Sequence, residues 1–180
     1  MKRMMSTRSA STRGAATDPA IAVPDLPSTP AASSPSARPC GWLWLAVRWL
    51  GALAVLAVGA VHLHEYDTLY SKVPTIGTLF VLNFAGATAI GLALLAPIER
   101  LAGRFGSMAL ALATLAGIGL AATAFVFLFI SERTPVFGFQ EPGYDPPGIT
   151  ASRVFEIAAV VLLGAFLIAR FAARARTRRW

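Results

Sequence analysis

Long hydrophobic segments without a single charge mark the middle of the chain. No charged residue occurs in residues 73–98 or in residues 105–131. Each segment is longer than the roughly 18 apolar residues that indicate a helix crossing a membrane. Two further apolar segments flank them, the earlier one interrupted by Arg48 and the later one by Glu156 and Arg170. The pattern predicts an all-α membrane protein, an up-down-up-down bundle of four transmembrane helices with spans at about residues 42–62, 75–97, 107–130 and 151–172.

The composition agrees with this class. The 180-residue chain is 56% hydrophobic and 14% charged, whereas soluble globular domains average about 45–50% apolar and about 25% charged residues. These values exclude an ordinary soluble enzyme. A single cysteine, Cys40, rules out an intramolecular disulfide and a CxxC redox motif.

The two ends of the chain differ from the hydrophobic segments. Residues 1–39 are rich in Ser, Thr, Pro and Ala and offer too little apolar surface to offset the entropy lost on ordering. We expect a disordered cytoplasmic tail there, a transmembrane domain over residues 40–173 and a basic cytoplasmic tail over residues 174–180. A signal peptide that includes the first span, cleaved near the small residues Val58 and Ala60, is the competing interpretation, although the apolar stretch exceeds the usual length of about 7–15 residues.

Positive charge is unevenly distributed between the two sides of the predicted bundle. Basic residues gather before the first span, in the loop at residues 98–106 and after the fourth span. Because positively charged loops stay in the cytoplasm, we expect both termini there, in a multi-pass protein of the cell membrane. The net charge of +7 comes mainly from the tails and favours anionic lipid headgroups over nucleic acid as a partner. The headgroup contacts are expected from Arg174, Arg176, Arg178 and Arg179.

Six of the nine acidic residues and both histidines fall on the predicted outer side. Among them Glu156 is the most informative, because an ionisable group inside a membrane is costly and marks a candidate functional site. Arg153, three residues earlier, is placed to pair with it on one helix face. At a similar depth His62 closes the first span, and Asn83 and Thr123 lie in the second and third. We predict that His62, Asn83, Thr123 and Glu156 line one polar outer pocket; a hydrogen-bond network that fixes helix register is the structural alternative.

Residues 62–67, at the end of the first span, read HLHEYD and contain four potential metal ligands: His62, His64, Glu65 and Asp67. Successive residues of a helix turn by 100°, so the two histidines lie about 200° apart and share one metal only if the helix has ended. A solvated helix end is the structural alternative.

Small residues recur at every fourth position in three spans. The stripes are Ala109, Ala113, Gly117 and Ala121 in the third span, Ala85, Ala89 and Ala93 in the second, and Ala165, Ala169 and Ala173 in the fourth. Such stripes let helix backbones approach closely. We expect the stripe of the third span to pack inside the bundle, whereas a stripe left free would serve a homodimer or a partner in a membrane complex.

The connection at residues 131–151 is long for a bundle, in which loops between helices typically have about 2–8 residues. Its four prolines and three glycines disfavour regular helix or strand. We expect an irregular loop over the polar pocket, acting either as a lid or as a passive cover.

Three stretches of the chain resemble a known group of proteins. They read HLHEYDTLYSKVPTIGTLFVLNFAGA, VFGFQEP and RVFEIAAV, in that order. The order is similar to that in uncharacterised four-span integral membrane proteins from actinobacteria, whose motifs fall here on His62 and His64, residues 74–83 and residues 138–141. This resemblance covers about residues 42–172 and implies a four-span fold without an assigned activity. A looser similarity to DoxX-like membrane proteins, also with four spans, implies a redox association.

Three function hypotheses follow from these patterns. The first is a non-enzymatic accessory or envelope-associated protein, because the sequence offers no Ser/His/Asp arrangement, thiol pair or phosphate-binding loop. The second is a membrane redox or metal- or haem-binding protein that uses the outer histidines and carboxylates. The third is a small proton-coupled carrier that uses Glu156 and, with only four spans, acts as a homodimer. The sequence does not identify a cofactor.

Overall fold

The computed structural model describes residues 41–141, 143 and 145–177. Its four long helices are α1 (Gly41–Glu65), α2 (Pro74–Leu95), α4 (Gly106–Ser131) and α5 (Pro146–Thr177). A π-helical segment, η1 (Tyr66–Tyr70), continues α1, while α3 (Ile98–Leu101) and the 3-10 turn η2 (Gly103–Phe105) connect α2 to α4. The described residues form no β-strand, so the all-α prediction is confirmed. The tail predicted at residues 1–39 lies outside the described residues, as do Arg178 and Arg179.

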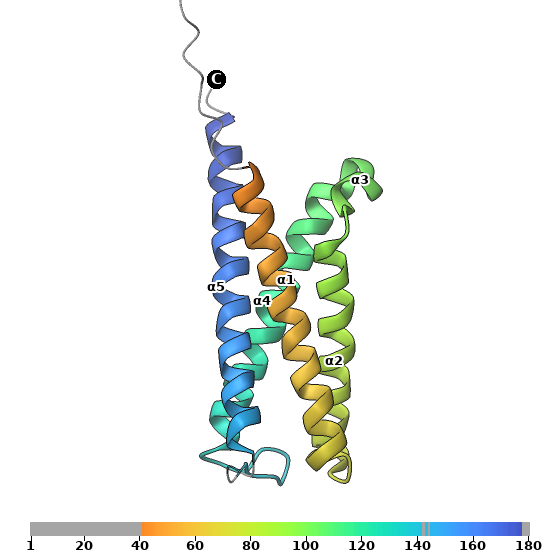
Figure 1. Ribbon diagram of the computed structural model, residues 1–180, viewed down its shortest axis with the longest axis vertical. Helices are drawn as coiled ribbons and strands as arrows, with labels where there is room; N and C mark the ends of the chain where they lie inside the picture. The colour runs from red at the N-terminus through yellow and green to blue at the C-terminus, as the bar shows by residue number, and fades with distance from the viewer. Residues whose placement is uncertain (1–40, 142, 144, 178–180) are drawn as a thin grey trace, which may run out of the picture. The chain divides into compact units, whose positions relative to one another are not determined.

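The four long helices form a ring in which each packs against the next along the chain (Figure 1). α1 packs against α2 on one side and α5 on the other, and α4 closes the ring by packing against α2 and α5. Successive helices run in opposite directions, as predicted for an up-down-up-down bundle (Figure 1). We call the end that holds the start of α1 and the end of α5 the terminal end, and the end that holds η1 and residues 132–145 the loop end.

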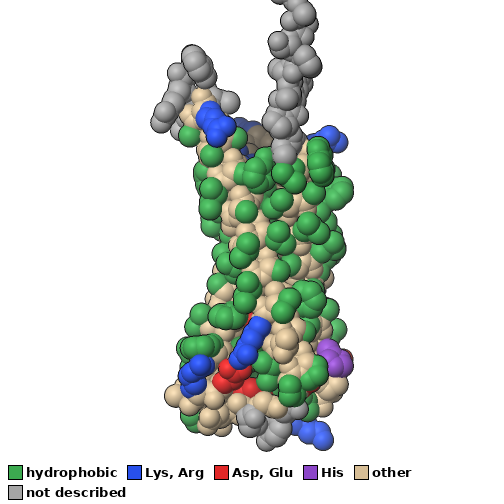
Figure 2. All heavy atoms as spheres, turned by 60° about the vertical axis from the view of Figure 1, so that its left-hand side comes forward, with side chains coloured by type: hydrophobic (Ala, Val, Ile, Leu, Met, Phe, Trp, Pro, Cys, Tyr) green, Lys and Arg blue, Asp and Glu red, His purple; other side chains and the backbone are tan. Residues whose placement is uncertain are grey.

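Each long helix has the length and composition of a membrane span. The 22 residues of α2 rise about 33 Å at about 1.5 Å per residue, close to the roughly 30 Å of a hydrocarbon core. Figure 2 shows the flank of the bundle covered by hydrophobic side chains, with charged side chains toward its two ends. The protein is therefore a multi-pass membrane protein.

Small residues allow α1 to approach its neighbours closely. A Cβ atom added to Gly59 of α1 would lie 2.9 Å from the Cβ of Ala87 on α2, and one added to Gly91 of α2 would lie 2.5 Å from Cγ of Leu56 on α1. Because lipid is as apolar as the helix surfaces, close van der Waals packing of this kind has to supply the association energy between the helices.

The buried face of α4 includes half of the predicted small-residue stripe. Gly117 and Ala121 are buried, whereas Ala109 and Ala113 are only half-buried. Toward the terminal end the buried positions are instead Gly106, Leu110 and Thr114. The helix repeats every 3.6 residues, so a row at strict four-residue spacing rotates by about 40° per step and leaves the core-facing side.

The stripes predicted in the second and fourth spans do not face the centre of the bundle. Ala85 and Ala89 on α2 and Ala165 and Ala173 on α5 are exposed on its outer surface. The homodimer and complex partner expected from a free stripe remain predictions.

The connection between the third and fourth spans is shorter than the sequence suggests. The expectation of an irregular loop up to residue 151 is wrong, because α4 ends at Ser131 and α5 already begins at Pro146. Pro146 and Pro147 occupy the first turn of α5, where proline is tolerated because the first N–H groups of a helix have no partner within it.

Three charged side chains are joined across the terminal end. Arg48 on α1 is 6% exposed, and its guanidinium donates to the carbonyl oxygens of Leu94, at 2.6 Å, and Ala96. Glu99 on α3 lies 3.9 Å from the Arg48 guanidinium and accepts a hydrogen bond of 2.8 Å from Arg170 on α5. We call Arg48, Glu99 and Arg170 the charged clasp. It links α1, the end of α2, α3 and α5.

The position of Gly117 predicts a strong effect of side-chain size. A Cβ added there would lie 2.8 Å from Cδ1 of Leu163, so Gly117→Leu should destabilise the bundle by roughly 1–3 kcal/mol or more. Gly164→Leu is the matched control, because a Cβ at Gly164 meets no atom within 4 Å. Thermal unfolding in detergent measures both. Equal midpoints for wild type and Gly117→Leu would contradict this packing.

Candidate functional site

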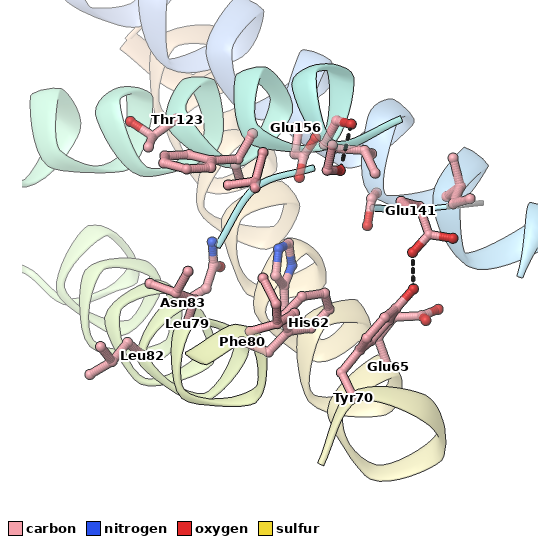
Figure 3. A pocket seen from close by; sticks show the side chains of 18 of the residues that line it. His62, Glu65, Tyr70, Leu79, Phe80, Leu82, Asn83, Thr123, Glu141 and Glu156 are labelled. Atoms are coloured by element: carbon pink, nitrogen blue, oxygen red, sulfur yellow. Dashed lines mark hydrogen bonds between the residues drawn. The ribbon is translucent and has the colours of Figure 1, made fainter. Parts of the chain in front are cut away.

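A cavity of about 440 Å³ lies at the loop end of the bundle. Its walls come from all four long helices, from η1 and from residues 132–145. The four residues predicted to line an outer pocket all line this cavity: His62 of α1, Asn83 of α2, Thr123 of α4 and Glu156 of α5 (Figure 3). The fold thus brings together side chains that lie far apart in sequence, each from a different helix.

Glu156 occupies a core position of α5. It is only 1% exposed, and the residues that share its helix face, Ser152, Ala159 and Leu163, are buried as well. The spacing of these positions follows the inward face of a helix, which in α5 is otherwise mostly apolar. The helical repeat of α5 therefore explains why the carboxyl group of Glu156 points into the bundle instead of toward lipid.

Arg153 does not pair with Glu156. Its guanidinium donates to the carboxylate of Glu132, at the start of the segment after α4. Arg153 lies on the outer side of α5, where it reaches the neighbouring helix end, whereas Glu156 faces inward. Among the described residues no ion pair to Glu156 is observed.

His62 is held by its own helix. Its Nδ1 lies 2.8 Å from the carbonyl oxygen of Val58, and since a carbonyl only accepts, the proton sits on Nδ1. In the neutral ring Nε2 then carries a lone pair and acts as an acceptor. The ring also packs against Phe80 of α2, with centroids 5.0 Å apart.

Three buried side-chain oxygens on the cavity wall accept no hydrogen bond from the described residues. They are Oε1 of Glu65, Oδ1 of Asn83 and Oε2 of Glu156. A buried polar atom without a partner costs about 1–3 kcal/mol. The Glu65 carboxyl shares a hydrogen bond with the Asp145 carboxyl, so the oxygens of Asn83 and Glu156 are the two that mark the cavity as a site for a polar group from outside the chain.

Glu65 enters the cavity wall because the start of α5 leaves room for it. A Cβ added to Gly148 would lie 1.8 Å from Oε1 of Glu65, so any other residue there would displace the carboxyl group. The sequence predicts Glu65 as a metal ligand and not as a residue of the pocket. The spacing of three between His62 and Glu65, which puts both on one helix face, was the signal for it.

The described residues between α4 and α5, 132–141, 143 and 145, form a cover over the cavity that is hydrogen-bonded to η1. The hydroxyl of Tyr70, which is buried, donates to the carboxylate of Glu141. Two hydrogen bonds between Val136 and Phe139, of 2.7 and 3.0 Å, close a tight turn, and the Phe139 ring meets the Tyr70 ring edge-on at 5.5 Å. Val136, Phe139 and Glu141 all line the cavity. The segment is therefore an ordered cover, and Tyr70 is a site residue that sequence reasoning missed.

The mouth of the cavity lies between α2 and α4. The exposed residues among its lining come from these helices: Leu79 and Leu82 from α2, Gly119, Thr123 and Phe127 from α4. Leu82, at 61% exposed, lies well within the α2 span. The opening therefore points sideways, at a depth where the surroundings of a membrane protein are lipid. Thr123 belongs to its rim and not to its interior.

The predicted metal ligands are divided between two surfaces. His62 and Glu65 line the cavity, whereas His64 and Asp67 are exposed elsewhere. The helix continues through residues 62–70, so the extended chain that a shared metal requires does not form. In the described part of the chain, no three His, Cys, Asp or Glu side chains are grouped to hold a metal.

Comparison with protein-family models, with curated proteins and with solved structures finds no significant match for this chain. The resemblance to actinobacterial four-span proteins and the looser one to DoxX-like proteins therefore stay predictions. Fold and site define the class on their own: a helical, multi-pass membrane protein with a laterally open cavity at one end.

The contact between Tyr70 and Glu141 predicts how firmly the cover is held. Tyr70→Phe removes the hydroxyl donor, and hydrogen exchange of the backbone amides at residues 136–141 should become about tenfold faster. Tyr66→Phe on the same segment is the control, because its hydroxyl makes no hydrogen bond to the described residues. Unchanged exchange in Tyr70→Phe would show that this contact does not hold the cover.

Proposed function

We propose that the protein is a non-enzymatic accessory protein of the cell envelope that binds a small apolar molecule from the bilayer. The observation that carries this proposal is the cavity at the loop end, whose mouth lies between α2 and α4. Its volume of about 440 Å³ falls in the range of about 300–1,000 Å³ typical of ligand pockets, and it opens toward lipid through apolar residues.

The arrangement of polar groups favours binding over catalysis. His62 donates to a carbonyl of its own helix and not to a carboxylate, so it lacks the orienting partner of a general base. The described cavity wall offers His62, Asn83, several carboxyl groups and the hydroxyl groups of Tyr70, Thr123, Ser131 and Ser152, but no thiol. The metal and haem hypothesis loses support because the outer ligands are separated.

The carrier hypothesis also finds less support than binding. The cavity lies at the loop end only, and farther along the bundle its centre is filled by the fully buried side chains of Val55, Leu110 and Leu163. A ligand that enters between α2 and α4 meets no path to the terminal end. We therefore assign the cavity to holding a ligand, not to moving one across the membrane.

Binding of a neutral fluorescent probe tests this proposal. N-phenyl-1-naphthylamine should bind saturably to the purified protein in phosphatidylcholine nanodiscs, above the background of empty discs. Gly119→Phe fills the mouth without a clash, since a Cβ there meets no atom within 4 Å, and should weaken binding about tenfold or more. Gly164→Phe, equally open but outside the cavity, should bind as the wild type does. No saturable binding, or equal binding by both variants, would refute the proposal.

The orientation in the membrane belongs to the same proposal. Basic residues dominate the terminal end, and Arg174 and Arg176 on the last turns of α5 are exposed there. The positive-inside rule supports both termini in the cytoplasm, with anionic headgroups contacting these arginines and Arg178 and Arg179 beyond them. The cavity then lies in the outer half of the bilayer.

Cysteine labelling in intact cells tests the orientation. In a Cys40→Ser background, Asp145→Cys at the loop end should react with a membrane-impermeant maleimide added outside, because Asp145 is partly exposed in the cover. Ser6→Cys should react only after the cells are permeabilised. Labelling of Ser6→Cys from outside would overturn the topology.

A further inference from the structure

Two side chains on the cavity wall keep oxygens without partners among the described residues. Oδ1 of Asn83 is a hydrogen-bond acceptor, and so is Oε2 of Glu156 when its carboxyl group is ionised, whereas the Glu65 carboxyl is bonded to that of Asp145. The exposed fraction of Glu156 is 1% and that of Glu65 is 6%. Both carboxyl groups therefore lie deep in the wall, where an unmade hydrogen bond is most expensive.

His62 adds a third acceptor. Its Nδ1 proton is committed to the Val58 carbonyl, which leaves Nε2 of the neutral ring with a lone pair. Figure 3 shows the His62 ring, the Asn83 amide and the Glu156 carboxyl directed toward the same space from three helices. A ligand in that space meets groups that need donors.

Carboxyl groups predominate among the ionisable side chains around the cavity, with His62 as the one basic group of the described lining. Three carboxyl groups line it, those of Glu65, Glu141 and Glu156, and none of the described lining residues is Lys or Arg. The nearest arginine along α5, Arg153, is bonded to Glu132 outside the cavity. A cation is favoured in such a site and an anion is excluded.

The remaining wall is apolar. Leu79, Leu82 and Phe127 stand at the mouth, and Phe80, Leu120 and Leu128 line the interior. An apolar body fits between α2 and α4 while its polar end reaches the acceptors. Bare metal cations do not match this wall, since no group of three ligands is found in the described residues.

We infer that the cavity binds an amphiphilic organic amine, with its protonated nitrogen donating to Glu156 and Asn83 and its hydrocarbon body lying between α2 and α4. This inference rests on the proposed function and specifies its ligand. The ligand enters from the bilayer with its ammonium group first.

Competition among amphiphiles that share the same hydrocarbon tail but differ in their head group tests the inference. Octylamine, octanol and octanoate are titrated against bound N-phenyl-1-naphthylamine in phosphatidylcholine nanodiscs at neutral pH. Octylamine should displace the probe at about tenfold lower concentration than octanol, because a hydrogen bond to a charged partner is worth at least that factor. Octanoate should be the weakest, since it brings a like charge and no donor.

Two matched substitutions distinguish recognition of the amine group from binding of any apolar molecule in the cavity. Glu156→Gln keeps the shape of the wall but should reduce the advantage of octylamine over octanol about tenfold, while the neutral probe binds as before. Glu132→Gln, at the same end of the bundle but outside the cavity, should leave the advantage intact. Equal displacement of the probe by octylamine and octanol in the wild type would overturn this inference. So would an unchanged advantage of octylamine over octanol in Glu156→Gln. In both cases saturable binding of the probe would still support the proposed function. Loss of probe binding in the wild type would refute both.

Discussion

The close approach of helix backbones is the constraint on which the rest of the molecule depends. In a bilayer the apolar surfaces of helices gain nothing by leaving lipid for one another, so the bundle is held by contacts that only small residues permit. Gly59 against Ala87 joins α1 to α2, Gly51 against Leu163 joins α1 to α5, and Gly117 against Leu163 joins α4 to α5. These contacts draw α1, α2, α4 and α5 into a ring.

The two ends of that ring treat buried polarity in opposite ways. At the terminal end the charged clasp pairs Arg48 and Arg170 with Glu99 and with backbone carbonyls. At the loop end Oδ1 of Asn83 and Oε2 of Glu156 find no partner among the described residues. Nε of Arg170 in the charged clasp is also unpaired, but only the oxygens at the loop end belong to residues that line a cavity, and there they are best explained as a binding surface.

The sequence predicts the number of spans and most of the pocket, each for an identifiable reason. Charge-free runs are long enough to define helices without tertiary information, and a Glu within an apolar helix has to turn inward. Helix ends and long-range contacts are harder. The start of α5 was missed because Pro146 and Pro147 favour loops except in a first helical turn. Tyr70 was missed because its bond to Glu141 spans 71 positions and depends on how the cover folds back.

The charged clasp has a consequence for the order in which the chain assembles. A helix with an arginine inside the hydrocarbon region enters a bilayer reluctantly, at a cost of about 2.5–3.5 kcal/mol near the centre. The groups that compensate Arg48, the carbonyls of Leu94 and Ala96 and the Glu99 carboxylate, are synthesised some 50 residues later, as α2 emerges. We therefore expect the first two helices to settle into the membrane as a hairpin, with α5 packing onto it once Arg170 reaches Glu99.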